Sequence, residues 1–327
     1  MIKRFLQTFC FLIFSGVIIY TLWMFRNAAA GYGETVPVWG YKGYTLEAFS
    51  ETHMAAPTHN HAPLPLIEEE EIVLCPERFD ELKEVIRRHG AGVAVFYKDV
   101  ISGDTFFYNK EQVFPIASII KAPYAMYVYR LAMERGLCMD ERIYTYTQAH
   151  HWGGTGRIQH MRVGTTFTLG ELLHHAIRYS DNIAMNIMMS VFPREDFTEF
   201  AAELGIPHLE NVRRITNGRI CAECAAVYLR AMHEFIEEGN EFSEIFREHL
   251  LNTTNVMIRA NYPIARKYGW ATDSFHDIGI IYNDRGPYLL VILSDRGCLA
   301  GDFPMFTAIS RAVERHHNSR FEERLSW

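Results

Sequence analysis

Two different hydrophobic periods run along the chain, and they predict helices and strands. Between residues 76 and 89, apolar side chains recur at helical spacing. Residues 92–98 and 105–109 instead favour two strands, which a Ser-Gly-Asp turn at residues 102–104 would join as a hairpin. A longer helical segment begins near Ser118. This part of the chain therefore predicts a helix, a hairpin and a second helix.

The remaining patterns predict helices in the middle of the chain and strands near its end. Thr168 and Glu171 have the spacing of a capping box, and the apolar stripe after them predicts a helix that ends at Tyr179. Residues 140–166 have no sustained period and predict an irregular connection. The later segments are helices at 222–235 and 242–251, strands at 265–270, 277–282 and 288–294, and a closing helix at 304–316.

The order of these elements predicts an α+β fold. Strands from both ends of the chain would form one antiparallel five-stranded sheet, with the terminal helices flanking one face. The central helices would form an all-α lobe. We expect the functional site between the sheet and this lobe, because ligand sites commonly form in such clefts.

Composition and charge limit the classes of function. The chain has 327 residues, of which 49% are hydrophobic, so it can bury a substantial core. Its formal net charge is −7, and it has no long basic run. These properties argue against nucleic-acid binding. We expect the chain to act as a monomer.

The N-terminus carries a membrane-targeting pattern. Lys3 and Arg4 precede an apolar run over residues 5–25, which is long enough to cross a bilayer. The two basic residues should stay on the cytoplasmic side, so the rest of the chain would lie outside. Three alanines at residues 28–30 form a candidate cleavage site for a secretory signal.

These features divide the chain into three parts. Residues 1–27 are expected to be a transmembrane anchor or a signal peptide. Residues 28–71, rich in Gly, Pro, Thr and His, predict an extracytoplasmic linker. Residues 72–327 would form one folded domain. The expected location is the cell membrane, with a single span and the domain outside, or secretion if the first segment is cleaved.

The chemistry-bearing pattern begins with Ser118 and Lys121. At this spacing a helix places both side chains on one face. A serine hydroxyl is a weak nucleophile until a base removes its proton, and a lysine with a lowered pKa can be that base. Taken alone, an ordinary helix start with an exposed lysine explains the pair better. Two later motifs, Ser180-Asp181-Asn182 and Lys267-Tyr268-Gly269, change that balance.

The three motifs occur in the order Ser-x-x-Lys, Ser-Asp-Asn and Lys-x-Gly. With them the chain resembles the class A β-lactamase-like and penicillin-binding serine hydrolases over residues 75–327. The resemblance implies a β-lactamase/transpeptidase-like fold and acyl transfer through a serine ester. It implies a β-lactam or a peptidoglycan stem peptide as substrate. We expect no cofactor and no metal ion.

The resemblance also assigns roles to single residues. Ser118 would be the nucleophile and Lys121 its base. Ser180 would carry a proton to the leaving nitrogen, and Lys267 would hold a substrate carboxylate. Burial and the charge of Lys267 would lower the pKa of Lys121.

A second group of residues is assigned to substrate binding. Asn182 would hydrogen-bond a substrate amide, because its side chain offers both a donor and an acceptor. Gly269 and Trp270 belong to the strand of the third motif. The N–H of Trp270 is a candidate oxyanion donor, in addition to the N–H of Ser118 itself. Trp152 would line the cleft, although a core tryptophan explains it nearly as well. Asp181 is expected to turn inward and hold its turn.

The sequence departs from the family pattern in two places. Tyr268 stands where the family usually has Thr or Ser, so a small hydroxyl that helps to bind the substrate carboxylate is lost. Class A enzymes also carry a Glu-x-x-x-Asn loop that positions the deacylating water, and no such pattern occurs between Asn182 and Lys267. Glu203 and Glu210 are the nearest carboxylates by position. Without that base an acyl-enzyme should be long-lived.

Several functions therefore remain open. The first is an exported, membrane-anchored serine hydrolase, either a genuine β-lactamase or a penicillin-binding D,D-peptidase. The second is a catalytically weak module that binds the cell wall. A third rests on Cys221 and Cys224, whose C-x-x-C spacing permits redox or zinc chemistry. For those two cysteines, a pair of small apolar residues on a buried helix turn is the favoured interpretation.

Overall fold

The structure, a computed structural model, describes residues 79–89, 92–206, 218–295 and 303–325. The expectations for residues 1–27 and 28–71 lie outside the described residues and stay predictions. Among the described residues, no helix is long and apolar enough to span a membrane.

A five-stranded antiparallel sheet forms the centre of the domain, as the sequence predicts, and its strand order is β2-β1-β9-β8-β7. The hairpin pairs the first two strands in sequence, and the last three strands pair with each other in chain order. The strands are β1 (Val93–Asp99), β2 (Thr105–Tyr108), β7 (Ile264–Ala271), β8 (Ser274–Asn283) and β9 (Gly286–Ser294). Because β7 is an edge strand, its side chains can reach around the end of the sheet.

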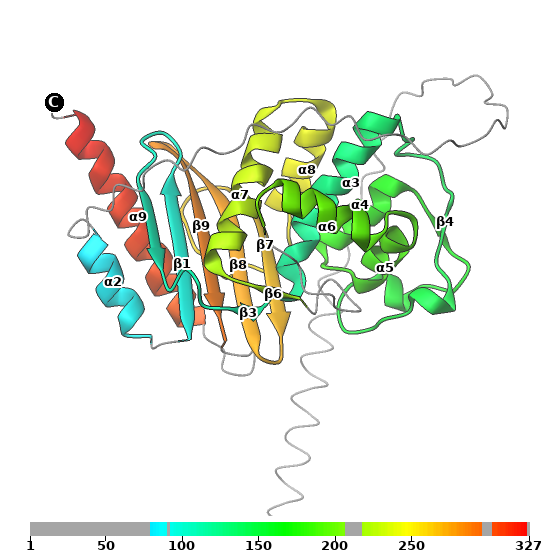
Figure 1. The fold of residues 1–327 in the computed structure, drawn as a ribbon, viewed down its shortest axis with the longest axis horizontal. Coiled ribbons are helices and arrows are strands. Elements are labelled where there is room, and N and C mark those ends of the chain that lie inside the picture. Colours follow the sequence, from blue (N-terminus) through cyan, green and yellow to red (C-terminus); the bar gives the residue numbers. More distant parts are fainter. Residues whose placement is uncertain (1–78, 90–91, 207–217, 296–302, 326–327) are drawn as a thin grey trace, which may run out of the picture. The chain divides into compact units, whose positions relative to one another are not determined.

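Both faces of the sheet are buried. Along β1, Val93, Val95 and Tyr97 face one apolar cluster, whereas Ala94 and Phe96 face the other. This alternation follows from the two-residue repeat of a strand. The helices α2 (Asp80–Arg87) and α9 (Phe303–Leu325) cover the first face, and α7 (Ala222–Glu237) covers the second (Figure 1).

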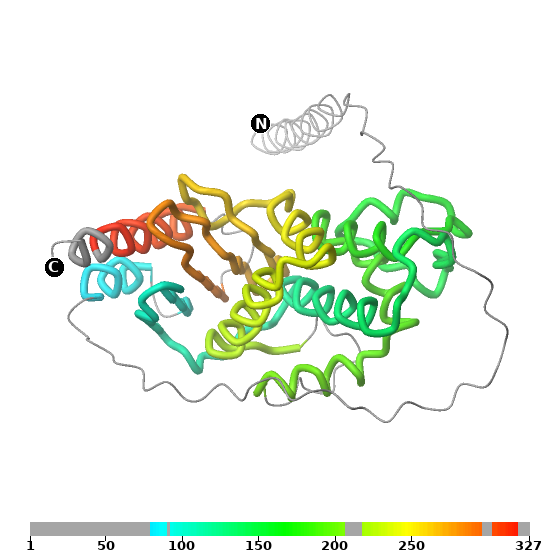
Figure 2. Tube along the Cα trace, turned by 90° about the horizontal axis from the view of Figure 1, so that it is seen from above, coloured from blue at the N-terminus to red at the C-terminus, as the bar shows by residue number. Residues whose placement is uncertain are grey.

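An all-α lobe packs beside α7, and it too matches the prediction (Figure 2). Its aromatic core includes Tyr124, Tyr127 and Phe197, whose rings contact one another at centroid distances of 5.3–5.9 Å. The helices of the lobe are α3 (Lys121–Arg135), α4 (Leu169–Arg178), α5 (Asn182–Val191), α6 (Arg194–Glu203) and α8 (Glu241–Leu251).

Local signals in the sequence explain several element ends. Thr168 and Glu171 form the predicted capping box, since Glu171 N–H donates to Thr168 Oγ1 and Thr168 N–H donates to Glu171 Oε2, both at 3.0 Å. The predicted irregular connection contains only short elements, which are β4 (Tyr144–Thr145), η3 (Gln148–His150), η4 (Ile158–His160) and β5 (Thr166–Phe167).

Two short elements lie next to the nucleophile turn. After Gly218, β6 (Arg219–Ile220) pairs with β3 (Phe114–Pro115) before α7 begins. The helix of Ser118 begins with a tighter turn, η2 (Ala117–Ile120), before α3 continues from Lys121.

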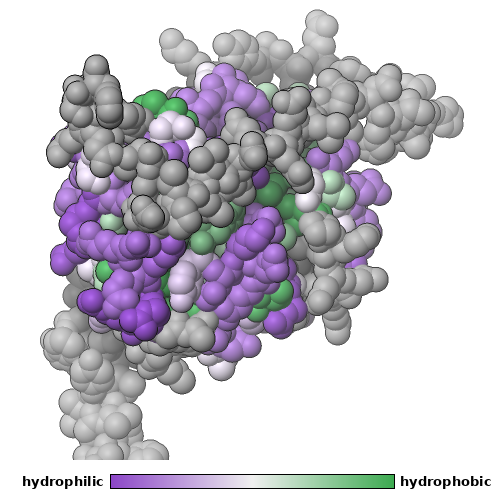
Figure 3. All heavy atoms as spheres, turned by 60° about the vertical axis from the view of Figure 1, so that its left-hand side comes forward, coloured by the Kyte–Doolittle hydropathy of each residue, from purple (hydrophilic) through white to green (hydrophobic). Residues whose placement is uncertain are grey.

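The outer side of α2 and α9 is polar. Figure 3 brings this side of the domain forward, and hydrophilic residues dominate what it shows around smaller apolar patches. Helix α2 buries Leu82 and Ile86 against the sheet, and Arg87 and Glu84 on its outer face form an ion pair at 2.9 Å. Such an exposed pair contributes little stability, about 0–1 kcal/mol, so burial of the apolar face holds the helix in place.

Candidate active site

Ser118 lies on a constrained turn at the junction of the sheet and the helical lobe. Ala117 just before it has a φ of 48°, which is unusual for a residue with a Cβ. The N–H of Ile116 donates to the carbonyl of Gly218 at 2.8 Å, and this bond fixes the approach to the turn. Ser118 is buried to 9% exposure. The surrounding structure therefore maintains a backbone conformation that costs about 1–3 kcal/mol.

The Lys121 amine is buried and tightly hydrogen-bonded. Its Nζ donates to the carbonyl of Ser180 at 2.5 Å and to Oδ1 of Asn182 at 2.7 Å, and it lies 3.3 Å from Oγ of Ser180. Burial lowers the pKa of Lys121 to about 7, against the charge of Asp181, which raises it. Because half of such amines are neutral at pH 7, Lys121 can accept a proton under ordinary conditions.

The turn of the second motif is anchored by Asp181, which faces inward as expected. Its Oδ1 accepts from the N–H groups of Ile183 at 2.9 Å and Ala184 at 3.1 Å, and thereby caps α5. Its Oδ2 accepts from the N–H groups of Arg157 at 2.6 Å and Ile158 at 2.9 Å. One carboxylate therefore ties the loop after Trp152 to the start of α5.

The protonation state of Asp181 follows from these contacts. Burial by itself would raise the pKa of the carboxyl. The nearby His175 ring, whose Nδ1 lies 3.8 Å from Oδ2, and the hydrogen bonds from the N–H groups of Ile158 and Ala184 outweigh burial and lower the pKa of Asp181 below its usual value. Asp181 is therefore ionised at neutral pH.

Ser180 and Asn182 flank this anchor and meet Lys121. Ser180 has a φ of 54°, and its carbonyl accepts from Thr155 Oγ1 at 2.7 Å as well as from Lys121. The Nδ2 of Asn182 donates to the carbonyl of Gly153 at 3.0 Å. Both ends of the Asn182 amide therefore have partners. Its assignment to a substrate amide stays a prediction.

Lys267 is also fully buried, and its amine lies against Tyr268. The Nζ donates to the carbonyl of Tyr268 at 2.9 Å and lies 3.9 Å from the centre of the Tyr268 ring. Burial, and then the charge of Lys121, hold the pKa of Lys267 well below its usual range. The charge of Lys121 thus acts on Lys267, whereas the pKa of Lys121 is lowered by burial and not by Lys267 as the sequence predicted. The carboxylate-binding role of Lys267 stays a prediction.

Tyr268 is a feature of the site that the sequence did not reveal. Burial raises the pKa of its phenol, and the side chains of Thr254, Ser180 and Asn255 lie close enough to act against that rise. From the family resemblance, Tyr268 was expected to remove the small hydroxyl that a Thr or Ser would place in the site. The structure instead brings a hydroxyl from a longer side chain to Ser180.

A buried ion pair supports the segment that carries Thr254. Arg266 Nη1 lies 3.1 Å from Oδ2 of Asp277, which also accepts from the N–H groups of Met257 at 3.2 Å and Ile258 at 2.9 Å. Burial raises the pKa of Asp277, against the charge of Arg266. This pair therefore fixes the chain between α8 and β7, close to the phenol of Tyr268.

Gly269 lets β7 approach the nucleophile turn. A Cβ at this position would lie 3.0 Å from Cγ2 of Ile119, 3.2 Å from its N and 3.3 Å from Cβ of Ala117. Any larger residue would therefore push the strand away from Ser118. Trp270 follows on the strand and is 44% exposed, with its ring 5.8 Å from that of Phe275.

The structure thus brings most of the expected site residues to one place. Lys121, Ser180 and Asn182 share hydrogen bonds, and Gly269 places β7 against the turn of Ser118. Trp152 is half-buried just before Gly153, whose carbonyl binds Asn182. The lining roles of Trp152 and Trp270 stay predictions.

Of the two carboxylates nearest by position to the missing Glu-x-x-x-Asn pattern, only Glu203 lies in the described part of the domain. Glu203 is the last residue of α6, and Glu210 lies outside the described residues. Within the described ranges, no group of three or more His, Cys, Asp or Glu side chains could hold a metal ion.

Comparisons with known proteins agree with this geometry. The model of the beta-lactamase enzyme family matches residues 77–316. A beta-lactamase of Serratia marcescens is 28% identical over 129 residues, which are 38% of this chain and 42% of that relative. The chain thus spans about two fifths of the length of the first curated relatives that it matches.

Two solved structures share the fold. A beta-lactamase of Sphaerobacter thermophilus superposes with a TM-score of 0.66 at 20% identity, covering 73% of this chain and 98% of that one. A PBP-A variant, in an acyl-enzyme complex with penicillin G, gives a TM-score of 0.65 at 18% identity, covering 76% and 97%. These likenesses confirm the β-lactamase/transpeptidase-like fold.

Proposed function

The chain belongs to the beta-lactamase enzyme family, and from that premise we propose that this β-lactamase-like serine hydrolase forms an acyl-enzyme through Ser118 with β-lactam amides. The observation that carries the proposal is the buried amine of Lys121, three residues from Ser118. Hydrogen bonds to Ser180 and Asn182 hold this amine in place, and its pKa is lowered to about 7.

Acylation would proceed in two proton transfers. Neutral Lys121 accepts the proton of the Ser118 hydroxyl while Oγ attacks the carbonyl carbon of the amide. The N–H groups of Ser118 and Trp270 stabilise the oxyanion. Lys121 then returns a proton through Oγ of Ser180 to the leaving nitrogen, the C–N bond breaks, and an ester remains on Ser118.

Tyr268 extends this proton path in the proposal. Its phenol lies beside Ser180, so in the proposal it hydrogen-bonds to the Ser180 hydroxyl and orients it toward the leaving nitrogen. A relay of Lys121, Ser180 and Tyr268 would thus take the place of the shorter relay that a Thr or Ser would form. The phenol supplies hydrogen bonding here and stays protonated, because burial raises its pKa.

A second candidate function is a penicillin-binding D,D-peptidase acting on peptidoglycan stem peptides. One sequence observation favours it, because the Glu-x-x-x-Asn pattern is missing between Asn182 and Lys267. Without that carboxylate the ester would be hydrolysed slowly. The PBP-A variant, which shares the fold, was captured as an acyl-enzyme with penicillin G.

Intact mass spectrometry of the full-length chain with benzylpenicillin tests both candidates. We expect an adduct in the wild type and none in Ser118→Ala. An adduct that persists for hours supports the penicillin-binding function, whereas a transient adduct with accumulating penicilloate supports a β-lactamase. No adduct, in a chain shown to be folded by circular dichroism, contradicts the acylation proposal and favours a cell-wall binding module.

We also propose that residues 1–27 attach the enzyme to the membrane as an uncleaved anchor. The support is the apolar run over residues 5–25 behind Lys3 and Arg4. Alkaline extraction of membranes should leave the full-length chain in the membrane fraction and should release a chain that starts after residue 27. Release of both would contradict an anchor, and a shortened chain in the culture medium would identify a cleaved signal.

A further inference from the structure

The first turn of α7 carries two cysteines outside the proposed active site. Cys221 is the N-cap of the helix, and its sulfur accepts from the N–H of Cys224 at 3.3 Å. The two Sγ atoms lie 3.2 Å apart. Both residues are half-buried, and Cys224 packs against the apolar core, so the interpretation of the pair as small apolar residues on a buried helix turn stays a prediction.

The surroundings make the two sulfurs unequal. Cys221 lies at the positive end of the α7 dipole, which stabilises a thiolate. The hydrogen bond from Cys224 is the largest influence and, against burial, lowers the pKa of Cys221 to about 6. The same hydrogen bond, followed by burial, raises the pKa of Cys224. Cys221 is therefore the attacking thiolate of the pair, and Cys224 stays protonated until the second step of a thiol–disulfide exchange.

Zinc chemistry fits this place less well. A structural zinc site takes four ligands, commonly cysteine and histidine. Cys221 and Cys224 would supply two, and no third ligand joins them within the described ranges. The contact of 3.2 Å between the sulfurs instead suits a reaction in which they bond to each other, because a disulfide brings its two sulfur atoms to about 2.0 Å and the movement needed is small.

We propose that Cys221 and Cys224 form a redox-active dithiol site whose substrate is a small-molecule disulfide. The Cys221 thiolate attacks one sulfur of the disulfide, the S–S bond breaks, and the first thiolate leaves and takes a proton from water. Cys224 then loses its proton to water and attacks Cys221 Sγ, the mixed disulfide bond breaks, and the second thiolate leaves and takes a proton from water. The protein loses two electrons, and the disulfide is reduced to two thiols.

The site is placed where such a substrate can reach it. Both cysteines are partly exposed, which leaves room for attack, and Cys221 follows directly on β6 at the N-terminal end of the helix. Cys138 offers an internal comparison, because it is exposed and has no cysteine partner in the described part of the chain. The Cys138 thiol can therefore form a mixed disulfide with a small molecule, but no neighbouring cysteine of the described chain can attack that mixed disulfide and release the small molecule.

The test uses the full-length chain with oxidised glutathione as the substrate, followed by alkylation of the remaining thiols and peptide mapping. We expect the peptide with Cys221 and Cys224 to gain an internal disulfide without bound glutathione. Cys138 should stop at the glutathione adduct. In Cys224→Ser, Cys221 should keep one glutathione, since the resolving thiol is gone.

A second measurement follows alkylation of reduced Cys221 by iodoacetamide against pH. The rate should level off above pH 6–7 in the folded chain, and in urea the midpoint should move to about pH 8.5, the value of an ordinary thiol. Stable glutathione adducts on both cysteines of the wild type would overturn the proposal. A folded-state midpoint near pH 8.5 would overturn it as well.

Discussion

The amine of Lys267 lies 3.9 Å from the centre of the Tyr268 ring, although the two residues are neighbours on one strand. Successive side chains of a strand normally point to opposite faces. Because β7 is the edge of the sheet, Lys267 can fold back over the ring, and the phenol can reach Ser180. The third motif is thereby joined to the second through Tyr268.

This contact predicts that Tyr268→Phe slows acylation while leaving the fold intact. The ring would still face Lys267, but Ser180 would lose its phenol partner. Removing one such hydrogen bond costs about 1 kcal/mol, so we expect acylation by benzylpenicillin to slow by roughly five- to tenfold. Stopped-flow or mass-spectrometric rates measure the effect, and the melting temperature should change little.

A matched variant separates the ring from the hydroxyl. Tyr268→Thr restores the usual family residue but removes a buried ring, which should lower the free energy of unfolding by about 3–5 kcal/mol. An acylation rate in Tyr268→Phe equal to that of the wild type would remove Tyr268 from the proton path.

Lys121 predicts the pH dependence of acylation. Its pKa is lowered to about 7 by burial, so the amine is protonated below that pH and cannot act as a base. The acylation rate should therefore rise as the pH increases through 7 and level off above it. Lys121→Arg keeps a positive charge at every accessible pH, and its rate should fall by about 10²–10⁴-fold without a step near 7. A rate that declines from pH 6 to 8 in the wild type would exclude Lys121 as the base.

Much of this arrangement followed from patterns in the sequence. The hairpin, the capping box at Thr168 and the three C-terminal strands depend on local periodicity, and the structure has them where the pattern predicts. Ser118, Lys121 and the turn of Asp181 followed from motif spacing. The prediction that these residues lie together in one site also depended on the family resemblance, because no local pattern in the sequence shows that Lys121 contacts Ser180.

The missed features depend on tertiary placement. The φ of 48° at Ala117 has no local signal, since alanine does not favour that region. The reach of Tyr268 to Ser180 depends on β7 being an edge strand, which pairing over long sequence distances determines. The unequal thiols of Cys221 and Cys224 depend on the exact residue at which α7 begins after β6.

Asp181 predicts a loss of stability in acid. Its lowered pKa means that the folded chain binds fewer protons than the unfolded chain around the usual value of 3.8. The stabilisation is present above that value and is lost as the pH falls through the folded-state pKa. Asp181→Asn should lower the free energy of unfolding at pH 7 by about 3 kcal/mol, because an amide cannot accept at both ends.

Urea denaturation at pH 7 and pH 3 measures this difference. The gap in the free energy of unfolding between wild type and Asp181→Asn should narrow at pH 3, because this pH lies below the usual carboxyl value of 3.8 and the unfolded chain is then largely protonated at this position. A gap that stays constant across this range would show that the charge of Asp181 does not contribute.

Gly269 predicts that close packing of β7 is needed for acylation. Gly269→Ala would place a Cβ 3.2 Å from the backbone N of Ile119, so the strand must move away from the turn of Ser118. We expect a loss of about 1–3 kcal/mol in stability and at least a tenfold slower acylation. Gly279→Ala on β8 is the matched control, because its Cβ would lie 2.7 Å from Cγ2 of Ile264, away from Ser118. Gly279→Ala should lower the free energy of unfolding and leave the acylation rate unchanged. If both variants acylate equally slowly, the slower acylation results from general unfolding and not from the position of β7.

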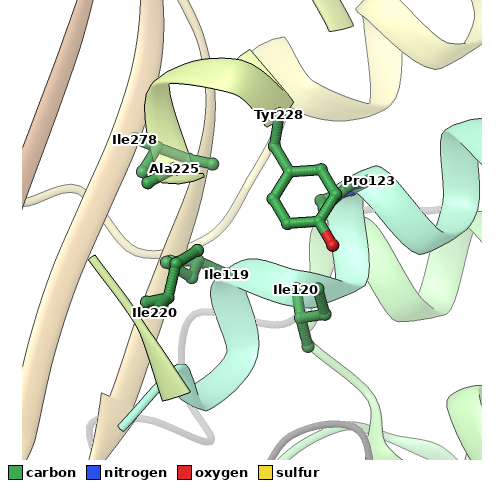
Figure 4. Close-up of a pocket in the computed structure, with 7 residues that line it drawn as sticks. All are labelled: Ile119, Ile120, Pro123, Ile220, Ala225, Tyr228 and Ile278. Atoms are coloured by element: carbon green, nitrogen blue, oxygen red, sulfur yellow. The ribbon is translucent and has the colours of Figure 1, made fainter. Parts of the chain in front are cut away.

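The dithiol site predicts that oxidation changes the acylation rate. Ile220, next to Cys221, packs with Ala225 and Tyr228 of α7 around a small apolar pocket whose other wall includes Ile119 and Ile120 of the nucleophile turn (Figure 4). A disulfide between Cys221 and Cys224 would tighten the first turn of α7 and shift this wall. The rate of acylation by benzylpenicillin should differ at least threefold between chains reduced with dithiothreitol and chains oxidised with glutathione disulfide. In Cys224→Ser the acylation rate should no longer depend on oxidation, whereas in Cys138→Ser it should depend on oxidation as in the wild type. Equal acylation rates in the reduced and the oxidised wild type would show that a disulfide in α7 does not affect the nucleophile turn through this pocket.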